Sequence, residues 1–259
     1  VAQFEESFRA YRGAEHAVAL NSCTAALHLA LLVSDIGPGD EVITTPLTFC
    51  ATVNAILHTG ATPVLADIDP VTGNIDPDAV EDAMTPRTRA LLPVHLHGRP
   101  CDMDRLMDIA RRHGLRVVED CAHATEGALR GRALGTFGDL GCFSFYATKN
   151  LTTGEGGMVL TGDPALAERI RTLALHGLDR DAWERFGSRG YRHYGVVAAG
   201  FKYNMMDVQA AIGLRQVDRL EEMSRRREMV WRVYEAAFRD LPVTRPAPIS
   251  PDERHARHL

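Results

Sequence analysis

Short apolar runs recur along the first two thirds of the chain, and stretches with helical spacing of apolar positions separate many of them. The apolar runs predict strands at residues 16–20, 41–44, 62–66, 90–94, 117–120, 142–146 and 158–160. The other stretches predict helices at residues 1–11, 25–32, 50–58 and 102–113. Strands that alternate with helices are typical of an α/β protein with a mainly parallel sheet flanked by helices.

The pattern changes near residue 207. Residues 207–238 have largely helical spacing, and the charged residues at 221–222 and 225–227 predict a long exposed helix. Prolines then recur between Pro242 and Pro251, which favours an irregular connection. We therefore expect one large α/β domain over residues 1–240, followed by a linker.

Composition narrows the classes of function. With 259 residues and 45% hydrophobic content, the chain can bury one large core, and its net charge of −5 gives no support to nucleic-acid binding. No apolar run approaches the length of a membrane span, and no signal peptide is evident. The five cysteines lie far apart and form no Cys-x-x-Cys motif. This spacing favours a protein of the reducing cytoplasm and argues against a structural zinc site.

Two other kinds of site lack the residues they need. Gly135, Gly138 and Gly141 do not have the spacing of a dinucleotide-binding fingerprint. His95 and His97 could bind a metal from one face of a strand, but the sequence offers no evident third ligand. We therefore expect neither a nicotinamide site nor a metal site.

Lys149 is the strongest candidate for chemistry. The chain has 29 lysines and arginines, and only Lys149 and Lys202 are lysines. Arginine never loses its proton in a protein, whereas a buried lysine can become a neutral amine that attacks a carbonyl carbon. Lys149 lies between two predicted strands, and Gly154, Gly156 and Gly157 follow it, so the backbone there can approach a bulky ligand closely.

Asp120 ends a predicted strand, and ligands gather at the carboxyl ends of strands in open α/β sheets. An acid and a lysine at one such edge are typical of pyridoxal 5'-phosphate (PLP) sites. The lysine amine binds the aldehyde of PLP, and the carboxylate keeps the pyridine nitrogen protonated. The strand at 16–20 leads through Ser22 and Thr24 into a helix, whose free amides and hydroxyl groups could bind the phosphate.

Five motifs, in order, carry a resemblance to a known family: SCTAALHLAL, GPGDEVITTPLTFCATVNAI, VVEDCAHATEG, GCFSFYATKNLTTGEGGMV and GFKYNMMDVQAAIG. Together they resemble the DegT/StrS family of PLP-dependent sugar aminotransferases. The resemblance implies the large domain of PLP-dependent transferase fold type I (aspartate aminotransferase-like) and a homodimer. It also implies glutamate as the usual amino donor and a keto-sugar carried on a nucleotide as the acceptor.

The resemblance assigns roles by position. Lys149 is then the Schiff-base lysine and proton carrier, and Asp120 is the partner of the pyridine nitrogen. Phe49 stacks on the cofactor ring, and His123 stands where relatives often have glutamine near the phenolic oxygen. The phosphate-binding positions are Ser22, Cys23, Thr24, Ala25 and Ser144, with Asn204 reaching the phosphate of the partner subunit's cofactor.

The resemblance also indicates the type of substrate and the domain boundaries. Segments 152–157 and 176–183 resemble members that aminate a 4-keto sugar, although cyclitol-ketone aminotransferases share parts of the pattern. A PLP-binding regulatory protein without turnover is the alternative from another class. Residues 241–259 resemble a linker and the start of the family's small C-terminal domain. Both ends of the chain look truncated by comparison with the family. We therefore expect that this small domain is largely missing.

Overall fold

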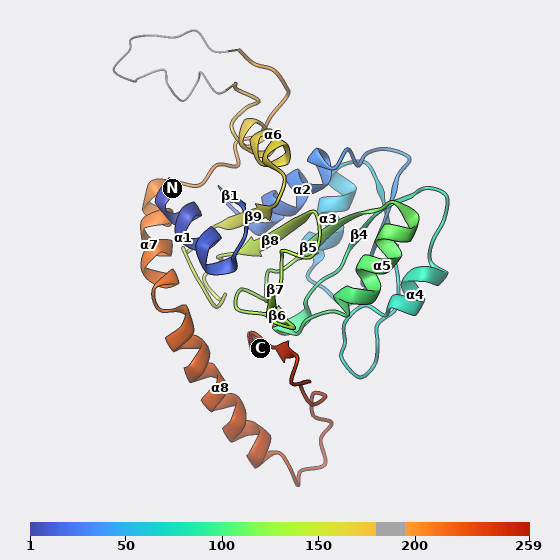
Figure 1. Ribbon diagram of the computed structural model, residues 1–259, viewed down its shortest axis with the longest axis vertical. Helices are drawn as coiled ribbons and strands as arrows, with labels where there is room; N and C mark the ends of the chain where they lie inside the picture. The colour runs from blue at the N-terminus through green and yellow to red at the C-terminus, as the bar shows by residue number, and fades with distance from the viewer. Residues whose placement is uncertain (180–194) are drawn as a thin grey trace.

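A seven-stranded sheet forms the centre of the computed structural model, which describes residues 1–179 and 195–259 (Figure 1). The strands are, in spatial order, β1 (His16–Leu20), β9 (Gly157–Thr161), β8 (Leu140–Ser144), β5 (Arg116–Asp120), β4 (Thr88–Leu92), β2 (Glu41–Thr44) and β3 (Thr62–Leu65). Strand β9 is antiparallel to both of its neighbours, and every other adjacent pair is parallel. The prediction of a mainly parallel sheet is confirmed.

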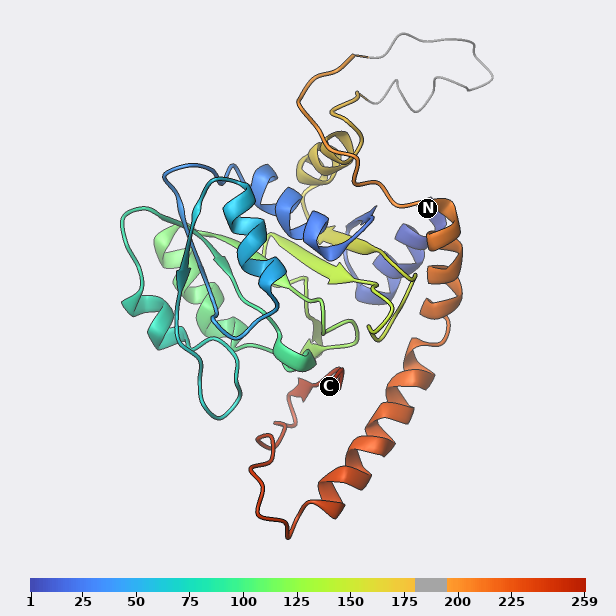
Figure 2. The ribbon, with the colours of Figure 1, turned by 180° about the vertical axis from the view of Figure 1, so that it is seen from behind.

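Helices cover both faces of this sheet (Figures 1 and 2). The α-helices of the described residues are α1 (Ala2–Arg12), α2 (Cys23–Val33), α3 (Cys50–His58), α4 (Pro77–Asp82), α5 (Met103–His113), α6 (Pro164–Ala174), α7 (Asp207–Val217) and α8 (Leu220–Ala237). Side chains of α1, α4, α5 and α7 pack into one apolar cluster with Ala17 and Ala19 of β1, whereas those of α2, α3 and α6 pack into another with Val18 and Leu20. Successive strand residues thus face opposite layers, which explains why the strands are continuous apolar runs.

Several predicted boundaries differ from the structure, among them those of β8, of β4 and of the helix at 207–238. Strand β8 ends at Ser144 rather than 146, because its pairing with β9 ends where Ser144 lies opposite Gly157. Strand β4 occupies 88–92 rather than 90–94. The predicted helix at 207–238 is two helices, with a break at residues 218–219. An apolar run in the sequence indicates which residues are buried. Where a strand ends depends instead on the hydrogen bonds that it forms with the neighbouring strands.

The end of the chain returns to the body of the molecule after α8 extends away from it (Figures 1 and 2). Residues 241–252 form neither helix nor strand, and β10 (Glu253–Arg254) then pairs antiparallel with β6 (Ala128–Leu129). Strand β6 also pairs with β7 (Arg132–Ala133), which completes a small three-stranded sheet. None of the described helices combines the length and the hydropathy needed to cross a membrane.

Candidate active site

The carboxyl ends of three parallel strands and the beginning of β9 meet at one edge of the sheet. Gly157, the first residue of β9, lies opposite Leu20 at the end of β1 and opposite Ser144 at the end of β8. Asp120, the last residue of β5, lies opposite Cys142 on β8. The sheet therefore brings the predicted acid, the predicted phosphate-binding serine and the start of α2 to the same edge, as expected for an open α/β sheet.

Asp120 is a buried carboxylate with only 4% of its surface exposed. Its Oδ2 accepts a hydrogen bond from the Thr52 hydroxyl at 2.9 Å, and its Oδ1 accepts one from the backbone amide of Ala122 at 3.0 Å. Burial raises the pKa of Asp120, while these donors and the nearby Lys149 oppose the rise. A buried carboxylate of this kind is stabilised by a cationic partner, and the protonated pyridine nitrogen of PLP is such a partner.

Lys149 lies in the turn between β8 and β9, and its side chain is only partly exposed. Its backbone amide donates to the carbonyl of Tyr146 at 2.9 Å, which fixes the turn. Burial lowers the pKa of the Lys149 amine, and the nearby Cys23 and Asp120 work against that change. A lowered pKa increases the fraction of neutral amine, which is the form that attacks an aldehyde.

The start of α2 provides backbone donors for a phosphate. Ser22 caps the helix, and its hydroxyl oxygen accepts from the amide of Ala25 at 3.1 Å. Within the described residues, the amides of Cys23 and Thr24 have no hydrogen-bond acceptor. Free amides at a helix start favour anions, so Cys23 and Thr24 fit the predicted phosphate role better than Ala25, whose amide is already bonded to Ser22.

Gly157 packs against this predicted phosphate-binding turn. A Cβ atom at Gly157 would lie 2.4 Å from the carbonyl carbon and oxygen of Ser22 and 2.7 Å from the nitrogen of Cys23. These are backbone atoms that cannot move without displacing the start of α2. The sequence therefore needs glycine here to let β9 and α2 approach each other.

We expect Gly157→Ala to weaken PLP binding by roughly tenfold or more, equivalent to about 1.4 kcal/mol, because it pushes the free amides out of position. Titrating PLP against the apoprotein by absorbance measures this change. Gly162→Ala is the matched control, since a Cβ atom at Gly162 has no neighbour within 4 Å. Equal PLP affinity in the two variants would show that the contact with Ser22 is not needed for the cradle.

Phe49 and Ser144 occupy suitable positions for their predicted roles. Phe49 immediately precedes α3, three residues before Thr52, and 72% of its surface is exposed. An exposed phenylalanine three residues before the donor to Asp120 is available to stack on a ligand ring. Ser144 is buried, and its hydroxyl oxygen accepts from the amide of Tyr146 at 3.4 Å. Both roles stay predictions.

His123 lies in a group of histidines that sequence analysis did not connect. Its Nδ1 accepts a hydrogen bond from the backbone amide of His97 at 3.3 Å. Its ring stacks with those of His97 and His258, with centroids 6.0 and 4.5 Å apart. Burial, followed by the charge of nearby Lys149, lowers the pKa of His123 to about 3. His123 is therefore neutral at pH 7, and it can donate a hydrogen bond without adding a positive charge.

Asn204 lies beside the start of the phosphate-binding turn of its own chain. It forms an antiparallel bridge with Leu20, and the next residue, Asn21, donates from its amide to the carbonyl of Tyr203 at 2.7 Å. The Asn204 side-chain oxygen accepts from Lys202 Nζ at 2.6 Å. The predicted contact with a partner subunit's cofactor stays a prediction, and residues 180–183 of the substrate segment lie outside the described residues.

The positions of His95 and His97 do not indicate a metal site that both residues share. His95 belongs to a buried group with Glu119 and Cys121, whose possible ligand atoms lie within 4.8 Å of one another. However, His95 Nε2 bonds to Glu119 at 3.0 Å, and His95 Nδ1 accepts from the amide of Cys101. Glu119 also accepts from the backbone amides of Gly135, Phe137 and Gly138. These bonds occupy the ligand atoms of His95 and Glu119 and hold residues 135–138 against β5.

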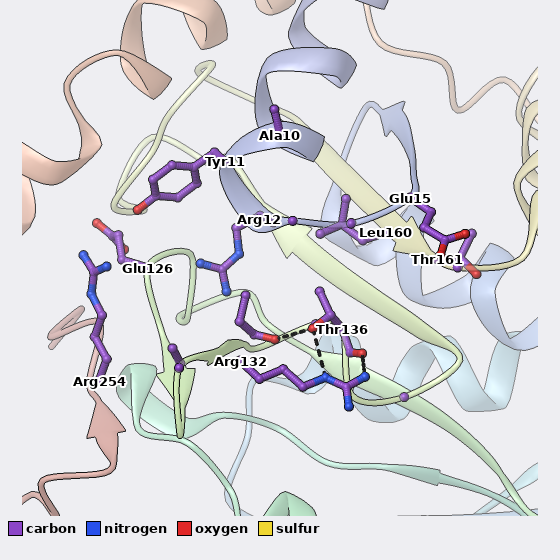
Figure 3. Close-up of a pocket in the computed structure, with 18 of the residues that line it drawn as sticks. Ala10, Tyr11, Arg12, Glu15, Glu126, Arg132, Thr136, Leu160, Thr161 and Arg254 are labelled. Carbon is purple, nitrogen blue, oxygen red and sulfur yellow. Dashed lines mark hydrogen bonds between the residues drawn. The ribbon is translucent and has the colours of Figure 1, made fainter.

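A sizeable cavity lies elsewhere in the described residues. It has a volume of about 680 Å³ and opens between the end of α1, the β6–β7 hairpin and Arg254 (Figure 3). Arg12 points into it and donates to the carbonyls of Gly127 and Leu134, while Arg132 donates to Thr136. None of the predicted site residues lines this cavity, so its size does not identify the active site.

The chain is similar to known proteins over its whole length. The model of the DegT/DnrJ/EryC1/StrS aminotransferase family matches residues 1–259. Spore coat polysaccharide biosynthesis protein SpsC of Bacillus subtilis is 55% identical over the whole chain, which covers 67% of that protein. GDP-perosamine synthase of Caulobacter vibrioides is 46% identical over 95% of the chain, which covers 64% of that protein.

Solved structures with a similar fold include sugar aminotransferases. The structure of the putative sugar aminotransferase Spr1654 from Streptococcus pneumoniae in its PMP form matches the whole chain with a TM-score of 0.93 and 33% identity, and the chain covers 70% of it. The same protein in its PLP form matches with a TM-score of 0.91. The predicted fold type is therefore confirmed.

Proposed function

Because this chain belongs to the DegT/DnrJ/EryC1/StrS aminotransferase family, its cofactor is PLP, and we propose that it transfers an amino group from glutamate to a nucleotide-linked 4-keto sugar. The observation that carries the proposal is the buried Asp120 at the same sheet edge as Lys149, whose pKa is lowered. The name of the relative GDP-perosamine synthase supports a nucleotide-linked acceptor. The 4-keto position follows from the resemblance of segments 152–157 and 176–183.

When bound, PLP supplies a protonated pyridine ring that accepts electron density from the carbon next to the transferred nitrogen. Asp120 holds the proton on the pyridine nitrogen, and Thr52 orients the carboxylate through its hydroxyl. The amides of Cys23 and Thr24 bind the phosphate, and Phe49 covers one face of the ring. His123 donates a hydrogen bond to the phenolic oxygen.

Lys149 has two tasks in this proposal. Its amine would hold the cofactor, and as a free amine it would carry a proton to and from the substrate carbon. A group that both accepts and donates a proton works best when its pKa is near the working pH. The lowered pKa of the half-buried Lys149 amine is in the direction that this task requires.

The proposal is tested by incubating the protein with PLP, glutamate and a panel of acceptors. The panel contains nucleotide-linked 4-keto sugars, nucleotide-linked 3-keto sugars and cyclitol ketones. We expect 2-oxoglutarate and an aminated 4-keto sugar in equal amounts, measured by mass spectrometry. Amination of only a cyclitol ketone would establish the alternative enzyme. Absence of turnover with every acceptor, with PLP bound at Lys149, would favour the regulatory protein.

We also propose that two subunits share each active site through Asn204. Replacing Asn204 with alanine removes about one charge-assisted hydrogen bond to the phosphate, roughly 1.5–3 kcal/mol, and weakens cofactor retention. Mixing Lys149→Ala subunits with Asn204→Ala subunits should restore activity, because one site of each heterodimer combines an intact Lys149 with an intact Asn204. A mixture no more active than the sum of the two variants, with subunit exchange shown by mass spectrometry, would place the whole site in one chain.

A further inference from the structure

Residues 255–258 lie against the candidate active site, although they are distant from it in sequence. The amide of Ala256 donates to the carbonyl of Gly98 at 2.9 Å, and the amide of His258 donates to the carbonyl of His97 at 3.1 Å. Ala256 is buried, and a Cβ atom at Gly98 would lie 2.8 Å from its Cβ. Glycine at 98 thus allows the segment to pack closely beside His97.

Asn150, the residue after Lys149, binds this segment in a defined orientation. Its amide nitrogen donates to the carbonyl of Ala256 at 2.9 Å and to Glu126 Oε2 at 2.8 Å. A backbone carbonyl can only accept, so the Asn150 nitrogen faces Ala256 and its oxygen faces His258. The Asn150 oxygen lies 3.1 Å from Nδ1 of His258. Since that oxygen can only accept, His258 carries a proton on Nδ1.

Glu126 holds Asn150 in turn. The Glu126 side chain is fully buried and forms an ion pair with Arg227 of α8. The Asn150 amide is therefore fixed from two sides, by α8 through Glu126 and by the chain end through Ala256. The residue next to Lys149 has little freedom to rotate.

His258 and His97 both hold the ring of His123 in place. The His258 ring stacks on the His123 ring with centroids 4.5 Å apart and an interplanar angle of 28°. The His97 amide donates to Nδ1 of His123, so a neutral His123 carries its proton on Nε2. Burial lowers the pKa of His258 to about 4, so His258 adds no charge to this group at pH 7.

We infer that Asn150 and His258 are positioning residues for the cofactor site. Asn150 holds His258 in the Nδ1–H form, and the stacked His258 holds the His123 ring so that its Nε2–H stays available as a donor. Neither residue touches the cofactor in this arrangement, and both act through His123. The inference rests on the proposed PLP site at Lys149, which borohydride labelling of Lys149 tests separately.

The first test needs no substitution. Long-range proton–nitrogen NMR spectra of the PLP-loaded protein, labelled with ¹⁵N-histidine, report which ring nitrogen carries the proton. We expect a neutral Nδ1–H form for His258 and a neutral Nε2–H form for His123 at pH 7.5. His258→Phe and His123→Gln assign the two signals. A proton on Nδ1 of His123, or on Nε2 of His258, would overturn the inference even where PLP is attached to Lys149.

The second test separates the stack from the hydrogen bond. We expect His258→Ala to raise the PLP dissociation constant roughly tenfold, about 1.4 kcal/mol, and to shift the absorbance maximum of the bound cofactor. His258→Phe keeps an aromatic ring and should change the constant by about threefold or less. Asn150→Ser should leave His258 in a mixture of both neutral forms. His113→Phe, at the exposed end of α5, is the control and should match the unmodified protein.

A purely structural role predicts a different outcome. In that case His258→Ala and Asn150→Ser would lower the melting temperature without changing the PLP dissociation constant, the absorbance maximum or the protonation site of His123. That result would overturn the inference. If His258→Ala does not fold, the spectra of the unmodified protein and of Asn150→Ser decide between the two roles.

Discussion

Replacing Lys149 with arginine is expected to abolish transamination although the positive charge is kept. A guanidinium group cannot form the covalent link to the aldehyde of PLP, and it does not release a proton at physiological pH. We expect the rate to fall by at least about 1,000-fold, equivalent to about 4 kcal/mol of lost transition-state stabilisation. Formation of 2-oxoglutarate from glutamate in a single turnover measures the loss.

Labelling identifies the lysine independently of turnover. Borohydride treatment of the PLP-loaded protein should attach the cofactor to the peptide that contains Lys149, and mass spectrometry of a protease digest locates it. The chain has one other lysine, Lys202, so Lys202→Arg is the matched control and should keep the label. A label on Lys202 would show that the assignment of Lys149 is wrong.

Asp120→Asn is expected to leave the fold and much of the PLP affinity intact while lowering turnover by roughly 100-fold or more, about 3 kcal/mol. The asparagine oxygen can accept from the Ala122 amide and its nitrogen can donate to the Thr52 hydroxyl oxygen, so the site keeps its shape. However, it cannot hold a proton on the pyridine nitrogen, and the loss falls on the transition state, where the ring must accept electrons. Turnover numbers and PLP titrations of the two proteins separate the effects.

Asp108→Asn provides the control for this substitution, because Asp108 is an exposed carboxylate on α5 that pairs with Arg111 and Arg112. Its turnover should equal that of the unmodified protein. Near-normal turnover in Asp120→Asn as well would show that Asp120 is only a buried residue at the end of a strand.

Much of the fold could be predicted because burial on both faces of the sheet leaves continuous apolar runs. The strands at 16–20 and 41–44 and the helix at 50–58 have the predicted limits. The break between α7 and α8 could not be predicted, since no proline or glycine occupies residues 218–219. Leu220 is fully buried just after the break, so packing against the body of the molecule accompanies the change of direction.

The candidate site could be proposed from the sequence where a single residue type suggests the chemistry. A rare lysine and an acid at the end of a strand indicate their roles without a structure. Thr52 and His258 could not be found in this way, because a threonine within a helix and a histidine near the chain end have many common roles. Their contacts with Asp120 and His123 exist only after distant segments pack together.

The position of β9 also affects the order in which the sheet can assemble. Within the seven-stranded sheet, β1 pairs only with β9, through contacts such as that of Leu20 with Gly157. During synthesis β1 emerges early and has no strand partner in this sheet until the chain has been made as far as residue 161. Pairings this distant in sequence slow folding and leave apolar strands exposed meanwhile. The turn that carries Lys149 joins β8 to β9, so the strand that pairs with β1 is also the strand that follows this turn.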